Sequence, residues 1–382
     1  MTYDLILKGG RVIDPAQGMD TVTDVAFAGG KVAAIEPNIA ATNGADVRDV
    51  SGRIVAPGFI DLHTHVYWGG TSLGVDAADF ARRSGVTTLI DAGSSGPGNF
   101  KGFLKHVIEP SEPRIFAYIH VSFAGIFAFS KRIMVGESSD MRLMSPADAV
   151  EVANANRDTI VGIKVRVGRN ASGASGIAPL DIAVQVAEEL SMPLMVHIDE
   201  PPPTYEDVLV RLRPGDTLTH CFRPFPNSPI TGQGAVKTAV LEARKRGVLF
   251  DVGHGMGSFS FKVARAMLDA GFMPDTISSD VHSLNLEGPV FDQATTLSKF
   301  LCLGTPLTDV IRATTANVAT AIRRPELGTL RPGSAGDATI FTVGEGSFPY
   351  IDSTGERMNG NKRILVEGIA LRGHWWHPAG NR

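Results

Sequence analysis

The fold is decided by the stretch Val55-Ala56-Pro57-Gly58-Phe59-Ile60-Asp61-Leu62-His63-Thr64-His65. It is an apolar run that ends in two histidines separated by one residue. Alternate side chains of a strand point to the same face, so His63 and His65 are expected to project together. Two imidazoles at the end of a buried strand form half of a transition-metal site. The alternative is a pair of ordinary strand-end histidines, and the rest of the chain must decide between the two.

The composition describes a large globular chain without a disulfide framework. Its 382 residues are 43% apolar and 20% charged, enough for one large domain with an appendage or for two domains. The net charge of −4, without a basic block, argues against nucleic acid or an anionic membrane as a partner. No apolar run reaches the ~18 residues of a membrane span. Two cysteines and an amino terminus without a signal-type segment predict a cytoplasmic location.

The two ends of the chain share a sequence pattern, in which short predicted strands are separated by glycines. Neither end holds enough strand to bury a sheet alone, so residues 1–56 and 328–382 are predicted to pack together as one small β domain. The predicted strands are Leu5–Leu7, Thr23–Phe27, Lys31–Ile35, Asp337–Val343 and Arg363–Gly368.

Between them, residues 57–327 alternate apolar strand-like runs with segments of helical spacing, which is typical of βα units around a parallel sheet. With the His63–His65 strand there are eight such strands, and eight parallel strands close most naturally into a (β/α)8 barrel. The fold class is therefore α/β. The other seven predicted strands are Val86–Ala92, Ile115–Val121, Ile160–Val167, Leu194–Ile198, Leu218–Cys221, Val248–Val252 and Thr276–Val281.

Polar side chains recur at the ends of these strands. Each would be unremarkable alone, but strand ends of a barrel meet on one rim, so together they predict a metal site. The six candidate ligands are His63, His65, Lys164, His197, His220 and Asp280.

The charges of these six residues do not balance two divalent ions. Neutral histidines contribute no charge, and Asp280 supplies one negative charge against four positive. A close pair of ions needs bridging anions. An ammonium at Lys164 would be repelled by the ions, so as written this lysine is a poor neighbour for them.

In their order and spacing, these residues resemble the amidohydrolase superfamily with binuclear metal sites. The resemblance runs the whole length, from Pro57–His65 to Gly328–Ala338. It implies that Lys164 is N6-carboxylated by carbon dioxide and becomes the missing bridging anion. It further implies that His63, His65 and Asp280 hold the more buried of two divalent ions, with His197 and His220 on the other. Zinc is the usual ion, although manganese, iron or cobalt would suit the same ligands.

Within the superfamily the chain looks like a dihydroorotase-like hydrolase, and more narrowly like deacetylases of N-acetyl amino acids and acetyl-2-hydroxy acids such as acetyl-(R)-mandelate. The cues are Ile163–Arg166, Asp251–Gly255 and Ser279–His282. The expected mechanism is attack of a metal-bridging hydroxide on the amide or ester carbonyl. Asp280 would then take the proton as general base and pass it to the leaving group as general acid.

Five residues are candidates for substrate binding. Arg166 shares strand parity with Lys164 and could bind a substrate carboxylate in bidentate fashion, or pair with a barrel carboxylate instead. Arg223 lies just past His220, and Tyr67 shares parity with His65 and could donate to the oxyanion. His254 and His282 lie near strand ends and could line the pocket.

Other features receive a structural interpretation. Cys221 is expected to be a buried apolar side chain rather than a nucleophile. Four histidines have no other candidate ligand or catalytic residue near them in the predicted fold and are assigned a structural or surface role: His106, His120, His374 and His377. Residues 123–144 and 168–176 look like inserts on the active-site face, either lids or loops without function.

The expected partner is a small acylated acid, with no nucleic acid and no membrane, and a homo-oligomer is left open. A cyclic amide hydrolase of dihydroorotase or hydantoinase type is the alternative function. A metal-free structural homologue would lack ligands, yet all six positions are filled. A mononuclear deaminase should lack an anionic bridge, so Lys164 argues against it.

Overall fold

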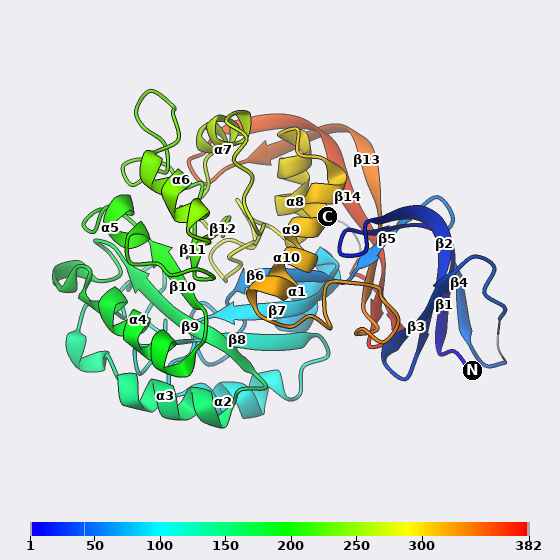
Figure 1. Cartoon of the computed structure of the whole chain (residues 1–382), viewed down its shortest axis with the longest axis horizontal. Helices are drawn as coiled ribbons and strands as arrows, with labels where there is room; N and C mark the ends of the chain where they lie inside the picture. The colour runs from blue at the N-terminus through cyan, green and yellow to red at the C-terminus, as the bar shows by residue number, and fades with distance from the viewer. Residues whose placement is uncertain (1, 42, 380–382) are drawn as a thin grey trace.

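The computed structural model describes residues 2–41 and 43–379. Two β-sheets organise them: a parallel sheet surrounded by helices, and a second sheet built from strands of both chain ends (Figure 1). Within the described residues, no helix is both long and apolar enough to cross a membrane.

The second sheet has the order β15-β14-β13-β5-β1-β2-β3, with β4 paired to β1. The amino-terminal strand β5 pairs antiparallel with the carboxyl-terminal strand β13, so the two ends of the chain share one sheet. Its strands are β1 (Leu5–Asp14), β2 (Met19–Ala28), β3 (Lys31–Glu36), β4 (Asp46–Asp49), β5 (Ile54–Pro57), β13 (Ala338–Ile351), β14 (Arg357–Leu371) and β15 (His374–Trp376). The strands β13 and β14 form a long hairpin that packs along α8 (Gln293–Cys302).

The parallel sheet has the order β12-β11-β10-β9-β8-β7-β6, with consecutive strands as neighbours. Its strands are β6 (Phe59–Thr64), β7 (Val86–Ala92), β8 (Arg114–His120), β9 (Ile160–Val167), β10 (Leu194–Ile198), β11 (Thr217–Thr219) and β12 (Leu249–Asp251). The bounds of β7, β9 and β10 coincide with the predicted runs. These strands are apolar and buried on both faces, as expected for a sheet that helices cover outside.

The predicted eighth strand, Thr276–Val281, is not a regular strand. Isolated parallel bridges join Thr276 to Asp251 of β12 and Val281 to Thr64 of β6, so the segment spans the gap between the two edge strands. Asp280 has a φ of +50°, which interrupts the extended backbone that a strand ladder requires. The prediction of a regular strand was wrong for this reason, although the segment occupies the place that the strand was expected to fill.

Helices surround the parallel sheet (Figure 1). Besides α8 they are α1 (Ala77–Ser84), α2 (Phe100–Phe103), α3 (Pro146–Ala155), α4 (Ala178–Leu190), α5 (Tyr205–Leu209), α6 (Thr238–Lys245), α7 (Phe261–Asp269), α9 (Leu307–Ala313) and α10 (Ala316–Ala321). Helix α4 buries Leu180, Ala183, Ala187 and Leu190 at helical spacing. Gly85 ends α1 with a φ of +71°, the left-handed conformation that glycine adopts without strain.

Candidate active site

Three predicted ligands meet at one end of the parallel sheet. His63 is in β6, His65 directly follows it, and Asp280 lies in the segment that adjoins β6. The Oδ1 atom of Asp280 is 3.2 Å from Nε2 of His63 and 3.1 Å from Nε2 of His65. The three ligand atoms lie within 4.8 Å of one another and are buried, an arrangement that could hold a metal ion.

Hydrogen bonds behind His63 determine which of its ring nitrogens carries a proton. The Thr219 hydroxyl donates its one proton to Oδ2 of Asp251 at 2.8 Å. Thr219 Oγ1, 2.8 Å from His63 Nδ1, can then only accept, so Nδ1 carries the proton. Burial lowers the pKa of His63 well below its usual value, so its Nε2 is a bare lone pair. That lone pair faces a carboxylate oxygen of Asp280, and a cation between the two would relieve the repulsion.

His197 and His220 form a second pair of donors. Nδ1 of His220 donates to the carbonyl oxygen of Gly253 at 2.7 Å, which leaves its Nε2 as an acceptor. That Nε2 lies 2.7 Å from Nδ1 of His197. Burial lowers the pKa of both histidines well below the usual value. In this contact Nδ1 of His197 therefore donates to Nε2 of His220. With the proton of His197 on its Nε2 instead, both nitrogens would be lone pairs that could ligate one ion.

Lys164 is fully buried beside these histidines. Its Nζ has no hydrogen-bond partner among the described residues. Burial lowers its pKa to about 7, which favours the neutral amine. Gly93 makes room for the side chain, because a Cβ at that position would lie 2.6 Å from Cγ of Lys164. A buried amine without a partner, among bare imidazole nitrogens, fits a lysine that is modified and engaged by metal ions.

The backbone is strained at two of these residues. His220 has a φ of +67° and Asp280 a φ of +50°, in the left-handed region that non-glycine residues seldom adopt. Such conformations cost free energy and are found where the surrounding structure imposes them, often at active sites. Here they turn two ligands from their strand ends toward the common centre.

The predicted substrate-binding residues divide into two groups. Arg166 and His282 line a cavity together with His63, His65, His197 and Asp280. Tyr67, Arg223 and His254 do not line it. Tyr67 donates to the carbonyl of Asn99 at 3.2 Å, and Arg223 donates to the carbonyl of Ile198.

His254 lies deeper than predicted, fully buried and stacked on Phe259. Its Nε2 is 2.8 Å from Nζ of Lys299. His254, Tyr67 and Arg223 thus lie outside the lining of this cavity, and their contact with substrate stays a prediction. Sequence parity had placed Tyr67 beside His65, but β6 ends at Thr64, so the alternation of a strand does not extend to Tyr67.

The cavity beside the candidate metal ligands is small. Its volume is about 30 Å³, room for a water molecule rather than for a small organic acid. Phe129, from the insert 123–144, forms part of its wall, with its ring 5.8 Å from that of His282. Ser72 donates to the carbonyl oxygen of Phe129 at 2.9 Å. The insert therefore forms part of the cavity wall, and a cavity of this volume must widen to admit a substrate.

No family model matches the chain, but individual relatives do. A deacetylase of Agrobacterium fabrum is 36% identical over 92% of this chain and 86% of its own. A deacetylase of Enterococcus faecalis is 33% identical over 97% of this chain and 96% of its own. The chain belongs to the dihydroorotase-like deacetylases of the amidohydrolase superfamily. It is a hydrolase of C–N bonds.

Solved structures of other amidohydrolases agree with this assignment. A crystal structure of a dihydroorotase has a TM-score of 0.91 and 33% identity, and covers 99% of each chain. A crystal structure of an adenine deaminase also has a TM-score of 0.91, with 30% identity over 98% of this chain and 99% of its own. Proteins named for different reactions therefore share this architecture. The substrate must be inferred from the residues of the site.

Two residues of this amidohydrolase site were missed in the sequence. His120, assigned above to structure or surface, ends β8 beside Lys164 of β9. Its Nε2 is 3.2 Å from Oε1 of Glu137, which comes from the insert and is 2% exposed. Oε1 of Glu137 is also 3.5 Å from Nε of Arg166. The position of His120 at a strand end could have indicated it, whereas Glu137 lies in an irregular segment without a pattern.

Glu137 is an anion despite its burial. Burial opposes its ionisation, but the charge of Arg166 and the contact with His120 outweigh that effect and lower the pKa of Glu137. Burial lowers the pKa of His120, so the imidazole is neutral. The pair of opposite charges at Glu137 and Arg166 is therefore buried at the mouth of the amidohydrolase site.

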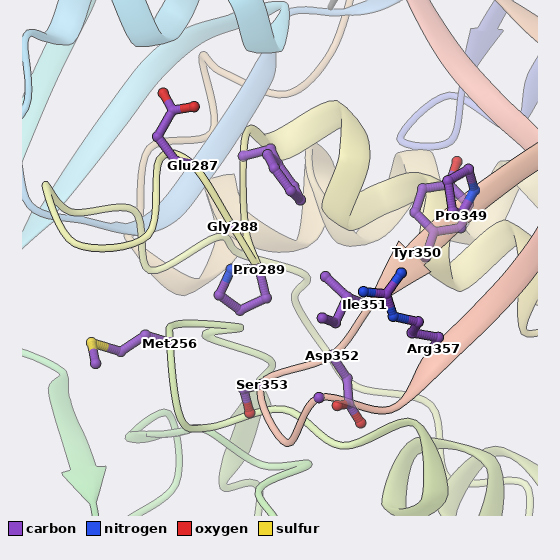
Figure 2. A pocket seen from close by; sticks show the side chains of 12 residues that line it. Met256, Glu287, Gly288, Pro289, Pro349, Tyr350, Ile351, Asp352, Ser353 and Arg357 are labelled. Atoms are coloured by element: carbon purple, nitrogen blue, oxygen red, sulfur yellow. The ribbon is translucent and has the colours of Figure 1, made fainter.

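A much larger cavity of this amidohydrolase lies elsewhere. It measures about 590 Å³ and is formed by Met256, residues 287–291 and the tip of the β13–β14 hairpin. Figure 2 shows Met256 and Pro289 on one side of it and Ile351 and Arg357 on the other. None of the six metal-ligand candidates lines it, so its size does not make it the catalytic centre.

Proposed function

We propose that the protein is a binuclear metal-dependent deacetylase that cleaves the acetyl amide or ester bond of small carboxylic acids, such as N-acetyl amino acids or acetyl-2-hydroxy acids. One observation carries the proposal. The amine of Lys164 is buried without a partner, among imidazole nitrogens whose protons are already directed away from it.

In this proposal His63, His65 and Asp280 hold one ion, and His197 and His220 hold the other. Lys164, carboxylated by carbon dioxide, contributes the anion between them. The neutral amine is the form that reacts with carbon dioxide, and the low pKa of Lys164 is compatible with it. Two divalent ions, zinc by preference, would lower the pKa of water and polarise the acyl carbonyl.

The other steps fall to side chains of the protein. Burial raises the pKa of Asp280 to about 6, so its carboxylate is a stronger base than a solvated one. Asp280 accepts the proton of the attacking water and delivers it to the leaving nitrogen or oxygen. The guanidinium of Arg166 binds the carboxylate of the substrate. Phe129 closes the cavity and excludes bulk water during the reaction.

The proposed partner is thus a small acylated acid, and neither nucleic acid nor membrane is involved. We also propose that residues 276–281 act as the eighth strand of a (β/α)8 barrel, since the segment bridges β12 and β6. Together with the terminal sheet this corresponds to a catalytic domain of residues 57–327 and a small domain of 1–56 with 328–382.

A substrate comparison tests the function. Purified, zinc-loaded enzyme is expected to release acetate from N-acetyl amino acids or acetylated 2-hydroxy acids, measured for both enantiomers. The second candidate, cyclic amide hydrolysis, is favoured by the dihydroorotase structure that is 33% identical over almost the whole chain. Dihydroorotate and a hydantoin are therefore assayed in parallel. Consumption of the cyclic amides alone would overturn the deacetylase proposal in favour of the second.

A further inference from the structure

Glu137 is buried two residues after an exposed apolar run. Ile133, Met134 and Val135 are 61%, 52% and 54% exposed, whereas Glu137 is 2% exposed. A loop that exposes apolar residues and buries a carboxylate reverses the usual preference. The burial of this charge must therefore be matched by specific partners, which are Arg166 and the neutral His120.

The backbone on either side of Glu137 is anchored. Gly136 lies so close to the insert 168–176 that a Cβ there would be 2.3 Å from the carbonyl oxygen of Ala171. The amide of Ser138 donates to that same carbonyl at 3.1 Å. The amide of Ala171 in turn donates to Asp199 at 2.9 Å, two residues beyond the metal-ligand candidate His197. The two inserts thus hold Glu137 in place relative to the strand ends.

The contact between Glu137 and Arg166 is made at one edge of the guanidinium. Oε1 of Glu137 lies 3.5 Å from Nε of Arg166, which is an ion-pair distance without a hydrogen bond between these two atoms. A guanidinium has five N–H donors in a planar fork, and the pair of terminal groups can bind a carboxylate in bidentate fashion. Because Arg166 lines the cavity beside the metal ligands, an acid held by its terminal groups would lie next to His63 and Asp280.

We propose that Glu137 is a positioning residue for substrate binding: it holds Arg166 by its Nε edge and directs the terminal amino groups toward the carboxylate of an acylated acid. The inference rests on the proposed function of Arg166 and deepens it. Phe129 of the same insert contacts the guanidinium from another side, with Cζ of Arg166 5.2 Å from the ring centroid. Closure of the insert therefore assembles the acid-binding subsite as well as covering it.

The test compares Glu137→Gln with the wild type on two substrates, an N-acetyl amino acid and its carboxamide, which lacks the negative charge. The variant keeps the shape of the side chain and removes its charge. We expect KM for the acid to rise about tenfold, KM for the carboxamide to change less than about twofold, and metal content to stay the same. A purely structural role of Glu137 would change both substrates alike and would overturn the inference.

Two further variants complete the design. Glu200→Gln is the matched control, because it removes the exposed ion pair with Arg169 at the neighbouring insert and should leave both KM values unchanged. In the double variant Arg166→Met/Glu137→Gln, the second change should add nothing to the first, since both act through one guanidinium. Additive effects would contradict the proposal.

Failure of this inference can be told from failure of the proposed function. If Arg166→Met affects acid and carboxamide equally, Arg166 does not bind the carboxylate and the function is revised. If Arg166→Met is selective for the acid but Glu137→Gln is not, only the positioning role is lost. A crystal structure of Glu137→Gln gives a readout without activity: the Arg166 guanidinium is expected to leave its position, and an unmoved guanidinium would refute the inference.

Discussion

Lys164 and Lys299 are both buried amines, but their surroundings differ in the hydrogen-bond acceptors that they offer. Both lysines are fully buried, and burial lowers the pKa of each to about 7. Nζ of Lys299 has three acceptors: Nε2 of His254 at 2.8 Å and the carbonyls of Pro289 at 2.8 Å and Ile351 at 2.9 Å. Nζ of Lys164 has no partner among the described residues. Burial alone therefore does not distinguish the two lysines, whereas the absence of a hydrogen-bond partner for Nζ of Lys164 does.

The two lysines also serve different purposes. Lys299 connects α8, the loop before it and the tip of the β13–β14 hairpin, next to the open 590 Å³ cavity. Lys299 therefore links these three segments, and its three acceptors match the three donors of an ammonium group. Lys164 lies among candidate metal ligands beside a small cavity. Four experiments can break or sharpen this comparison.

The largest effect is expected for Lys164→Ala. It removes the proposed bridging anion, so the protein should bind fewer than two ions, and kcat/KM should fall by about 10³-fold or more, the scale of a lost metal function. Metal analysis and kinetics measure both. Short carboxylates such as propionate should restore part of the activity by replacing the carbamate. Full activity with two bound ions would remove Lys164 from the site.

Lys299→Met should instead affect stability. It leaves two buried carbonyl groups without their donor and should lower the free energy of unfolding by about 3 kcal/mol, with metal content unchanged. Chemical denaturation of the metal-free protein measures this. Lys262→Met, at an exposed position of α7, is the control. In metal-free protein, Lys164→Met should not be destabilising, because no acceptor loses a partner; a loss equal to that of Lys299→Met would erase the contrast.

Thr219→Val tests the orientation of His63. The variant removes the oxygen that accepts from Nδ1, so zinc affinity should fall by about 10- to 100-fold, as for other groups that support metal ligands. Competition with a chelator measures the affinity. Thr217→Val is a matched control in the same strand, since its hydroxyl has no hydrogen-bond partner among the described residues. Equal losses from both variants would assign the effect to strand packing.

The smallest effect is expected for Phe129→Ala. Loss of the ring over Arg166 should raise KM for acid substrates by about 2- to 10-fold, the range of a cation–π contact. The control is Met256→Ala at the open cavity beside Lys299, which should leave kinetics unchanged. If Met256→Ala had the larger effect on KM, the substrate would bind in the open cavity instead.

Prediction from sequence succeeded where a short-range pattern specifies the structure. Apolar runs of β7, β9 and β10 coincide with the observed strands, because residues buried on both faces of a sheet leave a continuous signal. The same reasoning missed that residues 276–281 are irregular. The left-handed conformation of Asp280 is imposed by neighbours from distant parts of the chain, and nothing in the local sequence requires it.

The predicted pocket residues differ in whether they line the cavity beside the candidate metal ligands. Strand parity placed Arg166 correctly on the cavity, since alternation holds within β9. It did not hold for Tyr67, which lies beyond the end of β6. The position of His254 near a strand end did not indicate how deeply its side chain is buried. It was expected in the pocket and packs against Lys299 instead.

The sequence by itself determined the family, the rhythm of strands and the cluster of His63, His65 and Asp280, because these depend on residue type and on the order of strands along the chain. Only the tertiary structure decided which of two buried lysines lacks a partner, that Glu137 contacts Arg166, and that Phe129 lines the cavity. These facts depend on loops whose path is set by contacts between residues far apart in the chain. Such contacts leave no period or motif in the sequence.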